Sequence, residues 1–325
     1  MDAFHAMVLG VVQGLTEFLP ISSSAHLRIT AAGAGWDDPG AAFTAVIQIG
    51  TELAVLLYFR HDIARILRAW FGSLRPGAPP AAPPVPPTTA RDPDRSAAGE
   101  GTAAPPVAVV PPVAGGARPT IAARFAALDT DARMGWLIII GTIPIGVLGI
   151  LLQDTIKTAF RDMHLIAATL IVFGLLLGLA DRVARNERTL ERLTARHGLL
   201  YGLAQSLALI PGVSRSGGTI TAGLLLGYRR EAAARYAFLL AVPAVLASGL
   251  YELKDIGGAN TPDWGPTILA TVISFFVGYA VIAWLMRWIS TRSFAPFVIY
   301  RVVLGVVLLV LIAAGAIDPN AAAEI

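Results

Sequence analysis

Six windows of this chain are apolar for long enough to cross a lipid bilayer. A transmembrane helix needs roughly 17 to 25 mostly apolar residues. Windows of this kind occur at about 41–59, 134–152, 164–181, 236–253, 266–288 and 297–317. We therefore expect an all-α polytopic membrane protein with about six transmembrane helices.

The composition agrees with a bilayer environment and excludes several classes of protein. The 325 residues are 55% hydrophobic and only 14% charged, whereas soluble proteins carry about 25% charge. The net charge is +3 and the basic residues stand in separate loops, so a nucleic-acid partner is not expected. The chain has no cysteine, which excludes disulfides, thiolate nucleophiles and Cys-ligated metals. A metal ion has to be held by oxygen or imidazole.

Two further apolar stretches, at about 3–32 and 198–227, are interrupted in the middle by proline and by runs of serine and glycine. Irregular backbone at membrane depth persists only where protein or a water-filled cavity satisfies its polar groups. We expect both stretches to be re-entrant hairpins of broken helices. Each should enter the membrane, turn, and leave on the side it entered.

Arginine residues mark one side of the membrane. They follow the first, third and fifth windows and the second broken stretch, for example at Arg60, Arg182, Arg229 and Arg287. The positive-inside rule makes these loops cytoplasmic, and with six crossings both termini then lie outside. No Lys or Arg precedes Arg28, so a cleaved signal peptide is not expected.

A proline-rich segment divides the chain into three parts. Residues 76–119 hold 13 of the 22 prolines, a composition that cannot bury a core. We expect a disordered cytoplasmic linker at 72–130, without a functional site; a docking segment for a partner is the alternative. Residues 1–71 would hold the first hairpin and first span, and 131–325 the remaining five spans with the second hairpin. Together they would form one membrane domain.

The two broken stretches resemble one another. Gln, Leu, Pro and paired serines recur at an offset of 191 to 192 residues between QGLTEFLPISSS, which begins at Gln13, and QSLALIPGVSRS, which begins at Gln205. One hairpin and three crossings in each half would invert the second half relative to the first. In such an inverted-topology repeat, broken helices meet near the midplane and their N-termini point at an anion. Chance similarity of apolar helices is the alternative.

The first hairpin offers a carboxylate, hydroxyls and an imidazole. Gln13 and Glu17 lie four residues apart, on one face of a half-helix that Pro20 ends. A carboxylate facing lipid at mid-depth costs on the order of 2.5 to 3.5 kcal/mol, so Glu17 should line a cavity as metal ligand, general base or partner of an arginine. Further polar side chains follow within two turns at Ser22, Ser23, Ser24 and His26. Together these groups can activate attack on phosphorus or carbon; helix capping by the serines and a structural hydrogen bond of the histidine are the alternative.

The second hairpin places one arginine in an uncharged turn, PGVSRSGG, which begins at Pro211. Its glycines let backbone N–H groups approach a ligand, and Ser214 is expected to cap the helix that follows. The planar guanidinium of Arg215 suits bidentate recognition of phosphate. An ion pair between Arg215 and Glu17 across the repeat interface is the alternative, and the two roles are compatible in a resting state.

Two other charged residues fall inside predicted spans. Glu52, one turn from Gln48, is interpreted either as a residue near the substrate path or as half of an interhelical ion pair. Arg301 is expected to extend from the last span to the cytoplasmic interface.

Both motifs resemble the signatures of a known family. QGLTEFLPISSSAH, from Gln13 to His26, is similar to the Glu/Gln-x-x-x-Glu and serine-rich signature of the undecaprenyl-diphosphate phosphatases, also called bacitracin resistance proteins. PGVSRSG, from Pro211 to Gly217, is similar to their second signature. The resemblance covers nearly the whole chain apart from roughly 72–130. It implies a bacterial plasma-membrane enzyme that hydrolyses undecaprenyl diphosphate to the monophosphate and phosphate, which recycles the lipid carrier for peptidoglycan synthesis and confers bacitracin resistance.

The resemblance also implies roles for individual residues. Glu17 and His26 match the acid and the histidine that the family requires, Ser23 its candidate nucleophile, and Arg215 a phosphate-binding group. The other predicted substrate-binding residues are Gln13, Ser22, Ser24, Gly212, Ser214, Ser216 and Gly217. A divalent cation, Mg²⁺ or Ca²⁺, is implied, with Glu17 and Gln13 as candidate ligands, although a neutral amide weakens the case for Gln13. Membrane lipids are further partners, and a homodimer is left open.

We expect a cavity that opens to the outer face, in which Ser23 attacks the terminal phosphorus while Glu17 removes its proton or holds the metal. His26 as nucleophile and direct attack by water stay open. The alternative from another class is a lipid-carrier or anion transporter, or flippase, because inverted repeats with a midplane anion site also describe carriers.

Overall fold

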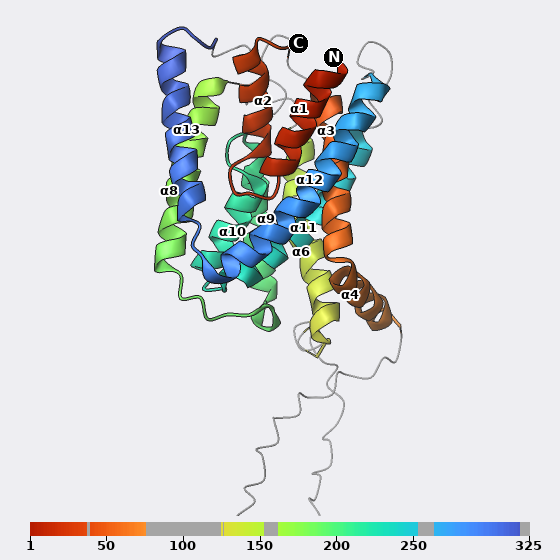
Figure 1. Cartoon of the computed structure of the whole chain (residues 1–325). Coiled ribbons are helices and arrows are strands. Elements are labelled where there is room, and N and C mark those ends of the chain that lie inside the picture. The colour runs from red at the N-terminus through yellow and green to blue at the C-terminus, as the bar shows by residue number, and fades with distance from the viewer. Residues whose placement is uncertain (38–39, 76–124, 126, 153–161, 253–262, 319–325) are drawn as a thin grey trace, which may run out of the picture.

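The regular structure of the protein is helical throughout the part that the computed structural model describes, which is residues 1–37, 40–75, 125, 127–152, 162–252 and 263–318 (Figure 1). The α-helices are α1 (Ala3–Thr16), α2 (Ser23–Ala34), α3 (Gly40–Tyr58), α4 (Arg60–Ser73), α6 (Thr130–Leu151), α8 (Met163–Val183), α9 (Ala195–Ser206), α10 (Arg215–Leu225), α11 (Arg230–Glu252), α12 (Trp264–Thr291) and α13 (Ala295–Ala313). Two 3₁₀ turns, η2 (Leu190–Arg192) and η3 (Leu207–Leu209), flank α9.

The predicted membrane spans are confirmed as helices. Five helices, α6, α8, α11, α12 and α13, are each long and apolar enough to cross a bilayer. A sixth candidate span is α3 with α4, which pass the same test together although the pair is bent by 77°. Large apolar side chains such as Ile150 and Phe276 stay exposed on the outside of the bundle, as lipid contact requires. The chain is therefore an all-α polytopic membrane protein.

Two helices depart from the predicted windows because charged side chains find partners near the span ends. α11 begins at Arg230, six residues before the predicted start, and Arg230 bonds Asp181 of α8 at 2.5 Å. After the bend, α4 is held by Arg65, which pairs with Asp62 at 2.9 Å and with Asp131 of α6 at 2.6 Å. Most of the predicted linker, 76–124, lies outside the described residues.

Each broken stretch forms a hairpin of two half-helices. α1 and α2 make the first hairpin and α9 and α10 the second. In Figure 1 the first hairpin starts and ends at the upper end of the bundle, where α13 also ends, and the second occupies the lower half. The hairpins therefore enter from opposite ends, as the inverted repeat predicts.

The first half-helix of each hairpin packs on a helix of the other half of the chain. α1 packs on α12 of the second half, and α9 packs on α6 of the first half. A Cβ atom at Gly10 of α1 would lie 2.6 Å from the Ala270 carbonyl oxygen, and one at Gly202 of α9 would lie 2.7 Å from Cα of Gly141. Small residues of this kind let helix backbones approach closely in membranes. Gly10 and Gly202 each stand three residues before the glutamine of their motif, so the repeat extends to packing.

Candidate active site

The site lies where the two hairpins turn, and both turn in the same way. Ser22 and Ser214 have φ of 75° and 70°, a region that residues other than glycine rarely occupy. Each serine precedes the first residue of the second half-helix of its hairpin. Their hydroxyls lie 3.3 Å from Ser24 Oγ and 3.1 Å from Ser216 Oγ. The same backbone conformation and the same pair of hydroxyls thus recur in both halves, and such strained positions cluster at functional sites.

The two turns differ in how the following helix is capped. The Ser214 hydroxyl accepts a hydrogen bond from the Gly217 N–H at 3.1 Å, as predicted. Ser22 makes no side-chain capping bond to α2, so the helix capping considered as an alternative for the serines is not found at this residue. Its hydroxyl is paired with that of Ser24 instead.

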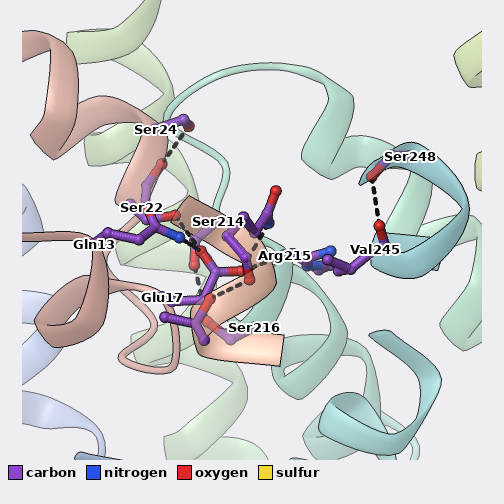
Figure 2. Close-up of polar contacts among 12 residues, drawn as sticks. Gln13, Glu17, Ser22, Ser24, Ser214, Arg215, Ser216, Val245 and Ser248 are labelled. Carbon is purple, nitrogen blue, oxygen red and sulfur yellow. Dashed lines mark hydrogen bonds and ion pairs between the residues drawn. The ribbon is translucent and has the colours of Figure 1, made fainter. Parts of the chain in front are cut away.

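The carboxylate of Glu17 is the centre of the site (Figure 2). Its Oε2 accepts hydrogen bonds from Ser23 Oγ at 2.6 Å and from Gln13 Nε2 at 2.9 Å. Its Oε1 accepts one from Gln48 Nε2 at 3.1 Å and forms an ion pair with Arg215. The cross-repeat ion pair that was the alternative role of Arg215 is therefore present, and the structure brings Gln13, Glu17, Ser23 and Arg215 together.

The first residues of two half-helices bond this carboxylate through their side chains. Ser23 is the first residue of α2 and Arg215 the first residue of α10, and both bond Glu17. Helix N-termini carry a partial positive charge and bind anions, phosphate groups included. An anionic ligand can therefore compete with Glu17 for Arg215, and it would then lie near the first residues of both helices.

Ser23 and Glu17 have the geometry of a nucleophile and its base. The Ser23 hydroxyl donates to the carboxylate across 2.6 Å, within the reach that proton transfer from an attacking hydroxyl requires. Ser24 lacks this contact, because its hydroxyl pairs with that of Ser22. Of the three serines in the motif, Ser23 is the one placed for activation by Glu17.

His26 faces a different set of groups. Its Nδ1 lies 2.7 Å from the Ser22 carbonyl oxygen, and its Nε2 lies 2.7 Å from the Tyr300 hydroxyl. The imidazole also stacks on the Tyr300 ring, with 5.5 Å between centroids. Both ring nitrogens thus hold the turn at Ser22 and the last span, and the catalytic role of His26 stays a prediction.

The prediction that Arg301 extends to the cytoplasmic interface is wrong. The side chain is fully buried and does not extend to the cytoplasmic interface. It donates to Pro20 O at 3.1 Å in one hairpin and to Gly212 O at 2.8 Å and Val213 O at 3.1 Å in the other. Broken helices leave carbonyl groups without helical partners, and the guanidinium satisfies them at both tips. The sequence did contain a signal for this burial, because an arginine inside an apolar span needs polar partners.

The remaining predicted phosphate ligands have structural partners. Ser216 Oγ donates to Leu19 O at 3.1 Å and thereby joins the two hairpins. A Cβ atom at Gly217 would lie 2.7 Å from Nη1 of Arg301, and Gly212 has φ of 87°. Close packing therefore explains both glycines, and their contact with substrate stays a prediction.

A small pocket opens beside the central ion pair. It is lined by Glu17, Phe18, Glu52, Val55, Arg215, Ser216, Ala237, Phe238 and Ala241. Among the described residues, Glu52 takes part in no ion pair, so the interhelical pair considered for it is not found, and its position favours the alternative role near the substrate path. Gln48, which the sequence did not single out as a site residue, bonds Glu17 directly.

The oxygen atoms of the site suit a hard divalent cation. Glu17 and Glu52 both line the pocket, and Oε1 of Glu52 is buried without a hydrogen-bond partner, as is Oε1 of Gln13, a residue outside the pocket lining. Mg²⁺ is commonly held by one or two carboxylates together with substrate phosphates. No group of three acidic or histidine side chains that could hold a metal by itself occurs in the described ranges. The donor set fits a cation that binds together with a diphosphate.

A comparison with models of known protein families identifies the family to which the chain belongs. The model of the family described as bacitracin resistance protein BacA matches residues 6–87 and 112–307. The chain belongs to the BacA family. The matched ranges contain the second hairpin, the first hairpin from residue 6 onward and every predicted site residue. The match is interrupted at 88–111, inside the proline-rich segment.

Curated members of the BacA family are similar over nearly their whole length. Undecaprenyl-diphosphatase 3 of Frankia alni is 57% identical over 341 residues, which cover 99% of each chain. The undecaprenyl-diphosphatase of Streptomyces griseus is 56% identical over 99% of this chain and 98% of its own. That of Thermobifida fusca is 53% identical over 100% of this chain and 95% of its own.

Proposed function

We propose that this protein hydrolyses undecaprenyl diphosphate to undecaprenyl phosphate and inorganic phosphate within a membrane. The observation that carries the proposal is the Glu17 carboxylate, bonded by Ser23 and Arg215 from the N-termini of two opposed half-helices. Its similarity to curated undecaprenyl-diphosphatases supports the choice of substrate. The transporter alternative is less favoured, because a carrier has no use for a hydroxyl held against a base.

The chemistry would begin when the diphosphate displaces Glu17 from Arg215. The guanidinium and the two helix N-termini then stabilise the charge on the phosphoryl oxygens. Glu17 takes the proton of Ser23, whose oxygen attacks the terminal phosphorus. The bond from that phosphorus to the bridging oxygen breaks, and undecaprenyl phosphate leaves with the bridging oxygen. Water then hydrolyses the phosphoserine and releases inorganic phosphate.

A divalent cation, Mg²⁺ or Ca²⁺, belongs to this proposal. When bound, it would neutralise charge on the phosphate oxygens. Oε1 of Glu17, the oxygen that Arg215 leaves, would hold it while Oε2 faces Ser23, and the unpartnered amide oxygen of Gln13 is the second candidate ligand from the first hairpin.

The proposed location is the bacterial plasma membrane, with the site open to the outer face and both termini outside. The segment between α8 and α9, which contains several arginines in the sequence, lies at the opposite end of the bundle from the end where the first hairpin begins (Figure 1). Recycling of the lipid carrier would serve peptidoglycan synthesis, and removal of the diphosphate would confer bacitracin resistance.

Phosphate release from undecaprenyl diphosphate by the detergent-purified full chain tests the function. Release that a chelator abolishes and Mg²⁺ or Ca²⁺ restores is the expected result. A folded wild-type protein that releases no phosphate with either cation would overturn the phosphatase and return the transporter to first place.

A further inference from the structure

Glu52 is a buried carboxylate that takes no part in the proposed attack of Ser23 on the diphosphate. It lies on α3, is 4% exposed, and its Oε1 has no hydrogen-bond partner. Burying an ionised carboxylate is costly unless it is paired and hydrogen-bonded, so a ligand that bonds Oε1 would stabilise it. The pocket that Glu52 lines is shared with Glu17 and Arg215, and a ligand there would contact the reacting groups.

The charges of the pocket change when substrate binds. Without substrate, Arg215 neutralises Glu17 directly. Once the guanidinium moves to the diphosphate, Glu17 and Glu52 face the same pocket as two carboxylates without a cationic partner. Two carboxylates beside phosphate oxygens are the donor set on which Mg²⁺ is usually held.

The first hairpin cannot supply the second negative charge. At the first position of its motif the chain has Gln13, a neutral amide whose Nε2 donates to Glu17 and whose Oε1 is buried without a partner. A carboxylate from another helix is needed if two are to hold the cation, and α3 provides one at Glu52.

We propose that Glu52 is the second carboxylate of a divalent-cation site that it shares with Glu17, formed when the diphosphate draws Arg215 away. This inference rests on the proposed cation requirement of the phosphatase. It assigns to α3 a ligand that the two signature motifs do not contain. The cation would bind tightly only together with the diphosphate, because the phosphate oxygens complete its coordination.

Binding of Mn²⁺ to the purified full chain, followed by electron paramagnetic resonance, tests the proposal without any turnover. The measurement is made with and without a polyprenyl methylenediphosphonate, which cannot be hydrolysed. For the wild type we expect tight Mn²⁺ binding only with the diphosphonate. Glu52→Gln should weaken it on the order of 10-fold or more. The control Glu231→Gln removes an exposed carboxylate of α11 and should bind as the wild type does.

A second variant tests the exchange of charge and guards against misfolding. The double variant Gln13→Glu with Glu52→Gln removes the carboxylate of α3 and adds one on the first hairpin. Its Mn²⁺ affinity should recover toward that of the wild type. Equal Mn²⁺ affinity of the wild type and Glu52→Gln would overturn the role of Glu52, as would a double variant that folds and recovers nothing. A wild type that binds no Mn²⁺ with the diphosphonate would refute the cation site altogether, whereas the phosphatase itself stands or falls with phosphate release.

Discussion

Four helices deliver one side chain each to the carboxylate of Glu17. Gln13 comes from α1, Ser23 from α2, Gln48 from α3 and Arg215 from α10. Four donors fix both carboxylate oxygens and so place the base before substrate arrives. Preorganisation of this kind removes reorganisation from the chemical step.

The unequal contacts of neighbouring serines lead to the first prediction. Ser23→Ala removes the hydroxyl that donates to Glu17, whereas Ser24→Ala removes one that is paired with the hydroxyl of Ser22. We expect Ser23→Ala to lower kcat by about 100-fold or more and Ser24→Ala to lower it much less. Steady-state phosphate release measures both. If the two variants lose activity equally, Ser23 is not the attacking group.

One physical reason explains why the sequence did not predict the partners of Gln48 and Arg301. Gln13, Glu17, Ser23 and Arg215 lie within short motifs, and their spacing along the chain already predicts that they converge. Gln48 and Arg301 lie outside these motifs, inside apolar helices, and the packing of α3 and α13 against the hairpins gives them partners. A lone polar residue in a span indicates that a partner exists, but its spacing does not identify which one.

At the scale of elements, the half-helices depend on close backbone contact. Their lengths and breaks could be predicted, because proline, glycine and serine interrupt otherwise apolar runs. The facing helices could not, since the pairs α1 with α12 and α9 with α6 join segments far apart in the chain. Glycine at these contacts determines how closely α1 approaches α12 and α9 approaches α6.

This packing gives the second prediction. Gly202→Ala places a methyl group against the backbone of Gly141 and should destabilise the protein by about 1–3 kcal/mol, as overpacking does. The control Gly146→Ala adds a methyl group on α6 where no atom lies within 4 Å. Thermal unfolding in detergent compares them. Equal midpoints for the two variants would show that the contact tolerates a side chain.

At the scale of the whole molecule, the inverted repeat explains why one site needs both halves. Each hairpin supplies one half-helix N-terminus, and they meet only because the hairpins enter from opposite ends (Figure 1). The repeat could be predicted from the sequence, since Gln13 and Gln205 begin matching motifs. Which end faces outward rests on the distribution of arginines and needs a direct test.

The orientation is the third prediction, and a chain without native cysteine suits it well. Cysteine at Ser24 should react with a membrane-impermeant maleimide added outside intact cells, as should cysteine at Ala314, the outer control. Cysteine at Leu74, after α4, should react only when the cytoplasmic side is opened. Labelling of Ser24→Cys from the cytoplasmic side alone would reverse the proposed orientation.

Phosphate release by Glu17→Gln and Arg215→Ala tests most directly whether the two hairpins form one phosphatase site. Each variant removes one member of the cross-repeat ion pair. We predict that both lower kcat/KM for undecaprenyl diphosphate by about 100-fold or more, while Arg229→Ala, an exposed arginine before α11, keeps it. If either variant folds and retains activity within a few-fold of the wild type, the reaction does not take place where the hairpins meet.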